Sequence, residues 1–262
     1  MSGRARSVER HLHVLSRLAS LRVCAAAFLV LSVLVTGQGS AASPVSKGII
    51  GEDDRVMLDA TAAPWRSLGK VNVAGEVFCT GTLIAPDLVV TAAHCLVWPG
   101  SGRLRALSDI HFVAGRHQDG YLGHAKAREV LLHPGFELSA QQDLAERHRD
   151  IALIRLDRAL EQEPLEPLSV APEQGARIDY AFYAKDRRYR LSRHAGCSFR
   201  EARLKIWLLD CDTVEGGSGG PVFMETEEGY RPVAIVVGFL VADQGTFSLA
   251  VPFSQLTAMG AR

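Results

Sequence analysis

The feature that most constrains the fold is a series of short runs rich in β-branched and aromatic residues, each interrupted by Gly, Pro, Asp or Asn. Such runs predict the strands of an all-β barrel or sandwich. A parallel α/β sheet is disfavoured because it needs helical crossovers of about a dozen or more residues, and helical periodicity is faint and confined to 138–149 and Phe253–Met259. The expected strands are 71–73, 77–84, 88–91, 110–114, 151–156, 178–183, 204–209, 233–241 and 247–251.

The N-terminus has the layout of a removable export signal. Residues 1–22 carry five arginines and one acid, and the apolar run 23–36 follows. Fourteen helical residues reach about 21 Å, short of a hydrocarbon core of roughly 30 Å. Ser40 and Ala42 are small residues at the positions that precede a cut before Ser43. We therefore expect cleavage there, with an uncleaved anchor as the alternative.

Removal of this signal changes the charge and the cysteine count. The whole chain has 29 basic and 29 acidic residues, whereas the part after residue 42 has 24 and 28. The resulting net charge of about −4 provides no basic field for nucleic acid or for a membrane surface. Because Cys24 lies in the signal, four cysteines remain, and an even number in an exported chain predicts two disulfides.

A glycine-rich run at 216–221 (GGSGGP) is the densest chemical signal in the chain. Four glycines around Ser218 expose its hydroxyl and allow the backbone to turn its N–H groups toward one point. The alternative is an ordinary glycine turn. A hydroxyl is a poor nucleophile at neutral pH, so catalysis would need a base within hydrogen-bond reach and a third group to orient that base.

The chain supplies candidates for both groups. His94 ends an apolar strand in TAAHC and is the candidate base, although an apolar-flanked histidine can also be a core residue. Asp150 leads into the strand sequence IALIRL and is the candidate orienting group, with a strand-end turn as its alternative role. A buried carboxylate needs a partner because an unpaired buried charge costs several kcal/mol.

The order of these residues discriminates among folds that use Ser, His and Asp. The pattern around Ser218 also fits the nucleophile elbow of α/β-hydrolases, but that fold needs a histidine after the serine and none follows. A subtilisin-type order would take an acid before His94, such as Asp53, Asp54 or Asp59, in an α/β fold that the strand pattern disfavours. His94, Asp150 and Ser218 remain, in the chymotrypsin order.

Several blocks resemble the chymotrypsin-like (trypsin-like) serine proteases in sequence and order, over nearly all of residues 50–256. They are FCTGTLI (78–84), VTAAHC (90–95), DIAL (150–153) and GSGGP (217–221). Two further segments, IGEDDR (50–55) and CDT (211–213), are similar to the bacterial glutamyl-endopeptidase-like branch.

The resemblance implies an all-β fold of two packed six-stranded antiparallel β-barrels with the active site in the cleft between them. We expect a signal peptide over 1–42, an N-terminal segment or short propeptide over 43–68, an N-terminal barrel over 69–160 with His and Asp, and a C-terminal barrel over 161–262 with Ser and a short C-terminal helix. The proline-containing segment 159–175 is the candidate crossing between the halves.

Roles follow from the same resemblance. His94 would act as general base and then acid, Asp150 would hold its tautomer, and Ser218 would attack the scissile carbonyl, with backbone N–H groups of Gly216 and Ser218 as the oxyanion hole. The implied disulfides are Cys79–Cys95 and, by elimination, Cys197–Cys211. The implied substrate-binding residues are Asp212, Thr213, Val237, Gly238 and Phe239.

Asp212 lies six residues before Ser218, where trypsin-like enzymes hold an acid at the floor of the specificity pocket. A carboxylate there would favour Arg or Lys in the substrate. Two departures limit the analogy. Gly217 stands where activatable enzymes have an Asp, so Ile49-Ile50-Gly51 is not interpreted as a trypsin-style activation switch, and 237–241 lacks the histidine of glutamate-specific enzymes, so no glutamate preference is predicted.

Other features carry less information. Eight basic residues between 185 and 205 more readily form a solvated face that influences acidic substrates than a nucleic-acid site. The remaining histidines show no zinc motif, so no metal or cofactor is predicted, and calcium is left open. We expect a secreted or periplasmic monomer that hydrolyses polypeptides, without nucleic acid and without a stable membrane anchor after signal removal. A catalytically silent protease-like domain that binds peptides or a partner is the alternative.

Overall fold

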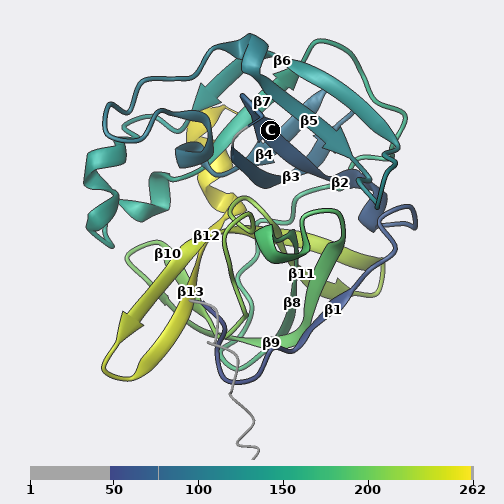
Figure 1. Cartoon of the computed structure of the whole chain (residues 1–262). Coiled ribbons are helices and arrows are strands. Elements are labelled where there is room, and N and C mark those ends of the chain that lie inside the picture. The colour runs from purple at the N-terminus through teal and green to yellow at the C-terminus, as the bar shows by residue number, and fades with distance from the viewer. Residues whose placement is uncertain (1–47, 76, 261–262) are drawn as a thin grey trace, which may run out of the picture. The chain divides into compact units, whose positions relative to one another are not determined.

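The structure, a computed structural model, describes residues 48–75 and 77–260 (Figure 1). The expected signal peptide and the cut before Ser43 lie outside these residues. Thirteen strands dominate the described part, and its helices are short 3₁₀ segments. No helix among the described residues is long and apolar enough to cross a membrane.

Six strands form a first closed antiparallel barrel in the order β2-β3-β4-β7-β6-β5. Their inward side chains, including Leu83, Val89, Phe112 and Ile154, have no exposed surface. The strands are β2 (Leu68–Val73), β3 (Val77–Ala85), β4 (Leu88–Thr91), β5 (Ile110–Ala114), β6 (Gly123–Leu132) and β7 (Ala152–Leu156).

The remaining strands form a second antiparallel sheet in the order β1-β9-β10-β13-β12-β11-β8. A further β8–β9 pairing closes six of them into a barrel, and β1 adds to the edge of β9. The strands are β1 (Arg55–Met57), β8 (Arg177–Tyr183), β9 (Leu191–Arg203), β10 (Ile206–Leu209), β11 (Pro221–Thr226), β12 (Gly229–Ala242) and β13 (Gly245–Pro252). The predicted fold class of two six-stranded antiparallel barrels is confirmed.

The two barrels share a hydrophobic core. One cluster of buried side chains contains Phe112 and Ile154 from the first barrel together with Ile235 and Val251 from the second. Burying apolar surface contributes about 25 cal/mol per Å² removed from water, so this shared cluster stabilises the packing of one barrel against the other. Figure 1 shows the two barrels one above the other, with β12 reaching the boundary between them.

Four strands were not predicted, namely β1, β6, β9 and β11. In β6, the buried residues are the small Ala125 and Ala127, the partly buried residues 130–132 pack against the core, and the exposed positions carry long charged side chains. In β9, inward Cys197 and Phe199 alternate with charged or small residues. Neither pattern contains the β-branched and aromatic runs from which strands were predicted, so burial of one face of each strand decides its conformation.

Two expected segments have different bounds or helix types. The strand expected over 204–209 begins at Ile206, because Leu204 and Lys205 adopt positive φ angles of 51° and 65° in the turn after β9. The helical segment Phe253–Met259 is a 3₁₀ helix, η7. The faint periodicity over 138–149 corresponds to two short 3₁₀ helices, η4 (Leu138–Gln142) and η5 (Arg147–Arg149).

Candidate active site

Strand pairing places His94 beside Asp150. β4 and β7 are antiparallel neighbours, with Thr91 opposite Ala152. The chain therefore leaves β4 and enters β7 at the same end of the barrel. His94 follows Thr91 by three residues in the 3₁₀ helix η2 (Ala93–Leu96), and Asp150 precedes Ala152 by two. The two residues, 56 apart in sequence, meet at this end.

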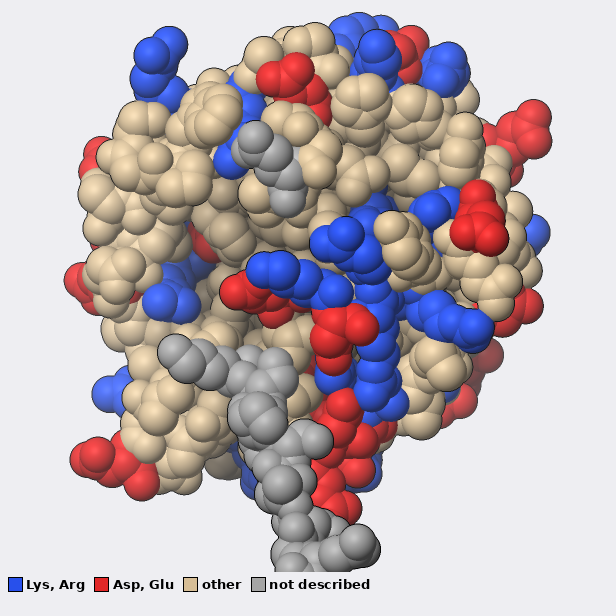
Figure 2. Space-filling view, viewed as in Figure 1, with Lys and Arg blue, Asp and Glu red and all other residues tan. Residues whose placement is uncertain are grey.

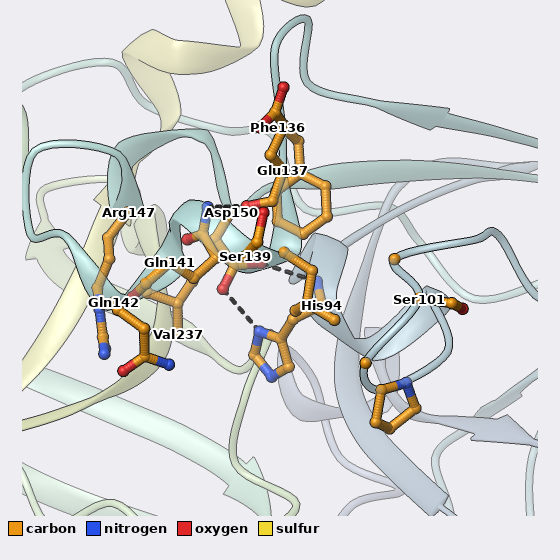
Figure 3. Close-up of a pocket in the computed structure, with 14 residues that line it drawn as sticks. His94, Ser101, Phe136, Glu137, Ser139, Gln141, Gln142, Arg147, Asp150 and Val237 are labelled. Carbon is orange, nitrogen blue, oxygen red and sulfur yellow. Dashed lines mark hydrogen bonds and ion pairs between the residues drawn. The ribbon is translucent and has the colours of Figure 1, made fainter.

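Two hydrogen bonds join this pair (Figure 3). His94 Nδ1 lies 2.6 Å from Asp150 Oδ2, and the His94 backbone N–H donates to Asp150 Oδ1 at 2.8 Å. Asp150 is 4% exposed, whereas 29% of the His94 side-chain surface is accessible. The carboxylate therefore holds Nδ1–H in place and leaves Nε2 as the nitrogen that can accept a proton.

The surroundings of His94 raise its pKa above the ordinary value of 6.5. Burial opposes the charged imidazolium most strongly, but the Asp150 carboxylate, through its charge and its hydrogen bond, more than offsets that effect. The positive charge of Arg147 opposes the imidazolium weakly. A histidine stabilised as the cation in this way is suited to take up a proton during a reaction.

The loop that carries Ser218 packs so closely that its glycines have no space for a side chain. Gly216 and Gly219 have φ angles of 94° and 80°, in the left-handed region that favours glycine. A Cβ on Gly219 would lie 2.2 Å from the Thr80 carbonyl oxygen, and one on Gly217 would lie 2.4 Å from the Tyr180 hydroxyl. The glycine-rich turn is therefore packed between Thr80 of the first barrel and Tyr180 of the second.

Backbone donors in this loop divide into two sets. The amides of Gly217, Gly219 and Gly220 all donate to backbone carbonyls at 2.7–3.0 Å. Over the described residues, the amides of Gly216 and Ser218 have no acceptor. Two N–H groups, two residues apart, are thus available to bind a negatively charged oxygen.

Ser218 and His94 line the same cavity, of about 360 Å³. Within the described part of the chain, the Ser218 hydroxyl makes no hydrogen bond to His94, whose Nε2 lies 3.7 Å from the sulfur of Cys95. Cys95 is disulfide-bonded to Cys79. Since both sulfurs are used in that bond, the cluster of Cys79, His94 and Cys95 lacks the thiolates that a metal would need.

A second and larger cavity, of about 820 Å³, also has His94 in its lining (Figure 3). Asp150, Arg147 and Val237 are among the residues that line it. Gly238 has a positive φ of 151°, and a Cβ there would lie 3.4 Å from an Arg147 guanidinium nitrogen. Of the expected substrate-binding residues of β12, which are Val237, Gly238 and Phe239, Val237 lines the cavity.

Asp212 lies elsewhere. It is completely buried, its Oδ1 accepts the backbone N–H of Ile50 at 2.8 Å, and its Oδ2 accepts that of Asp54 at 3.1 Å. Thr213 donates its own amide to the Gly48 carbonyl. Asp212 lines neither cavity beside His94. The preference for Arg or Lys that the sequence suggested therefore receives no support from this geometry.

Sequence reasoning missed Thr80 and Tyr180, whose side chains hydrogen-bond to the backbone of the Ser218 loop. Thr80 Oγ1 donates to the Gly216 carbonyl and accepts the Tyr183 amide, and Tyr180 donates its hydroxyl to the Gly217 carbonyl. The side chains of Thr80 and Tyr180 are both buried in strands. A threonine or tyrosine in a strand is common, so no sequence signal distinguished them.

The second disulfide joins Cys197 to Cys211. Both expected disulfides are thus present in the structure. Cys211 is the neighbour of Asp212, so this bond holds the irregular segment after β10 whose Asp212 accepts the amides of Ile50 and Asp54.

Comparison with known proteins gives a consistent picture. Residues 57–178 match the family model described as Trypsin. A trypsin of Saccharopolyspora erythraea is 36% identical over 140 residues, 53% of this chain and 51% of that protein. A glutamyl endopeptidase of Bacillus licheniformis is 32% identical over 93 residues, 34% of this chain and 28% of that protein. The chain spans about half, or less, of the length of these curated relatives.

A solved structure of a Glu endopeptidase superposes with a TM-score of 0.67 and 20% identity. The match covers 81% of this chain and 97% of the solved chain. At this identity the likeness concerns the fold, and it agrees with the two closed barrels.

Proposed function

The sequence and the fold confirm the resemblance to the chymotrypsin-like (trypsin-like) serine proteases, and on that premise we propose that this chain is an exported serine endopeptidase. The observation that carries the proposal is the His94–Asp150 hydrogen bond at 2.6 Å, with Ser218 in the same cavity as His94. The resemblance supplies the reaction type, and the geometry is compatible with each of its steps.

In the first step, His94 Nε2 takes the proton of the Ser218 hydroxyl as its oxygen bonds to the scissile carbonyl carbon. Asp150 stabilises the imidazolium that forms, and it keeps Nδ1–H pointed away from the serine. Collapse of the tetrahedral intermediate breaks the peptide bond, and His94 returns the proton to the leaving amine. Water then attacks the acyl-enzyme with His94 again as base, which releases the acid and restores Ser218.

The oxyanion of each tetrahedral intermediate would bind to the amides of Gly216 and Ser218, which have no other acceptor among the described residues. Loss of one such donor typically costs about 2.7–4 kcal/mol of transition-state stabilisation. Hydrogen bonds from the Thr80 hydroxyl to the Gly216 carbonyl and from the Tyr180 hydroxyl to the Gly217 carbonyl support the position of both N–H groups.

Substrate residues that precede the cut would pair with β12 near Val237–Phe239 and lie along the larger cavity. An antiparallel strand addition of this kind uses backbone hydrogen bonds and therefore tolerates many side chains. Export would follow from the predicted signal peptide, and two disulfides suit an oxidising compartment. N-terminal sequencing of the secreted protein tests the cut before Ser43.

Labelling with a fluorophosphonate tests the enzymatic proposal. The wild-type protein should be labelled at Ser218, and Ser218→Ala should abolish labelling while it retains the wild-type circular dichroism spectrum. A folded wild-type protein that stays unlabelled would instead favour the binding module without turnover. His94→Ala should slow labelling by several orders of magnitude, since the hydroxyl then lacks its base.

A further inference from the structure

The cavity that Ser218 shares with His94 carries an excess of positive charge. Arg105, Lys185 and Arg188 line it, and Glu215 is the acidic residue among its lining. Lys185 belongs to the 3₁₀ helix η6 (Lys185–Arg187), which follows β8. Figure 2 shows Lys and Arg side chains gathered near the middle of this face, with acidic side chains beside some of them.

Among the residues that the structure describes, two of the three cations have no carboxylate partner. Lys185 Nζ pairs with the Glu215 carboxylate at 2.5 Å. Arg188 is exposed, and no described carboxylate lies within 4.0 Å of it. Arg105 is 5% exposed, its guanidinium lies 4.0 Å from the centre of the Trp98 ring, and its Nε donates to the Val97 carbonyl at 3.4 Å, whereas its Nη1 has no hydrogen-bond partner over the described residues. A buried cation without an anion is costly, so an anion supplied by a ligand would be favourable here.

A further cation, Lys70, lies next to Phe78, which lines the cavity. Lys70 is buried, its Nζ lies 3.7 Å from the centre of the Phe78 ring, and it donates to the Arg188 carbonyl. Burial first, and then the charges of Arg188 and Arg116, lower the pKa of Lys70 to about 8. The cations around this cavity therefore repel one another and would be relieved by a nearby negative charge.

The position of the cavity identifies the part of the substrate that enters it. His94 lines both cavities; Asp150 and Val237 belong to the lining of the larger one, and Ser218 and Gly216 to the lining of this one. In the proposed function, residues that precede the cut lie along β12 in the larger cavity. The chain that follows the scissile bond, whose amine receives the proton from His94, must then enter the smaller one.

We infer that this cavity selects substrates with an Asp or Glu side chain at the first or second residue after the scissile bond. The inference rests on the proposed endopeptidase function and names a preference of its leaving-group side. Arg188 is the principal determinant, because its guanidinium can pair with a carboxylate through two parallel hydrogen bonds and has no competing partner among the described residues. Glu215 weakens the preference, since it occupies Lys185 and repels an incoming carboxylate.

A peptide series tests this preference. The peptides share one sequence before the cut and carry Asp, Asn or Lys at each of the two positions after it. We expect the Asp peptide to be cleaved with kcat/KM about tenfold above that of the Asn peptide at one of these positions, and the Lys peptide to be poorest. Equal kcat/KM for Asp, Asn and Lys at both positions would overturn the inference.

Matched variants assign the preference to residues. Arg188→Gln should bring the Asp-to-Asn ratio close to one, and Glu215→Gln should raise it. Arg203→Gln is the control, because Arg203 is also exposed, forms no ion pair with a described carboxylate and lies at the end of β9 outside both cavities. An unchanged ratio in Arg188→Gln would refute the assignment to Arg188.

Failure of this inference can be separated from failure of the proposed function. A p-nitrophenyl ester has no residue after its scissile bond, so its hydrolysis reports the triad alone. Hydrolysis of the ester with no preference among the peptides would leave the protease intact and remove the acidic selectivity. Absence of both ester hydrolysis and fluorophosphonate labelling would remove the enzyme itself, and with it the inference.

Discussion

Tyr180 donates its hydroxyl to the carbonyl of Gly217, next to Ser218, at 2.6 Å, from a side chain with no exposed surface. This one contact ties the candidate nucleophile loop to β8. The position that holds an activating Asp in trypsin-like zymogens is filled here by a glycine against a tyrosine hydroxyl. The loop is therefore supported from within the second barrel.

Tyr180→Phe should destabilise the protein by about 0.5–1.5 kcal/mol, because the Gly217 carbonyl loses one buried hydrogen bond and keeps the one from the Gly220 amide. The ring stacks on Phe182 at a centroid distance of 4.2 Å and should keep its place. We also expect kcat to fall more than KM rises, since the loop positions Ser218. Thermal unfolding and steady-state kinetics measure both effects, with exposed Tyr189→Phe as the control. Wild-type values in Tyr180→Phe would show that the hydroxyl does not support the loop.

Gly219→Ala should destabilise the protein by several kcal/mol more than Gly175→Ala. The two glycines have nearly the same φ angle, 80° and 82°, so the backbone penalty of about 1–2 kcal/mol is shared. Only the Cβ on Gly219 meets neighbours, at 2.2 Å from the Thr80 carbonyl oxygen and 2.3 Å from Thr91 Oγ1. Chemical denaturation of the two variants isolates the steric part. Equal losses of stability would disprove the close packing of the loop.

Arg147→Gln should shift the acidic limb of the kcat/KM profile to higher pH. The charge of Arg147 disfavours the His94 imidazolium, so its removal raises the pKa of His94 further above 6.5. In the proposed mechanism His94 must be neutral to act as base, so activity should appear only above that pKa. Arg128 is an exposed residue of β6 that pairs with Asp87, so the control variant Arg128→Gln should leave the acidic limb unchanged. A shift to lower pH in Arg147→Gln would contradict this electrostatic account.

The contribution of His94 to the stability of the native state should fall with rising pH, whereas the activity should rise. The folded pKa of His94 is raised, so its pairing with Asp150 stabilises the native state fully below the unfolded value of about 6.5, and this contribution is lost as the pH rises through the folded pKa. Denaturation of the wild type and of His94→Gln across this range should show the difference between them shrinking with rising pH. A constant difference would argue against a raised pKa.

Asp212→Asn should release the N-terminal segment. The two carboxylate oxygens accept the amides of Ile50 and Asp54, and an asparagine offers one carbonyl oxygen in their place. One buried donor then loses its acceptor, at a cost of about 1–3 kcal/mol. Limited proteolysis should cut the variant faster within 48–58 than the wild type. Asp210→Asn is the control, since Asp210 pairs with Arg200 at the surface. Equal cleavage of Asp212→Asn and wild type would rule out this anchoring role.

Much of the fold was predictable because the most regular strands bury β-branched and aromatic side chains. β4, β5 and β8 follow such runs, and their bounds agree with the expected ranges within one residue. β6 and β9 were missed because their buried apolar residues, such as Phe199 in β9, stand among alanine, histidine, cysteine and charged neighbours and form no β-branched or aromatic run. A strand of that composition forms because its neighbours pair with it, and local sequence does not contain that information.

The candidate site was likewise predictable from the sequence only in part. By itself the sequence identified the candidate catalytic residues, because His94, Asp150 and Ser218 occur in short blocks whose types and order suit only one of the folds considered. The tertiary structure alone decided where those groups and their neighbours lie. It placed Asp212 against Ile50 and Asp54 and assembled Arg105, Lys185 and Arg188 around one cavity. The physical reason is that burial, charge balance and pocket shape depend on segments far apart in the chain, which come together only when the two barrels close and pack.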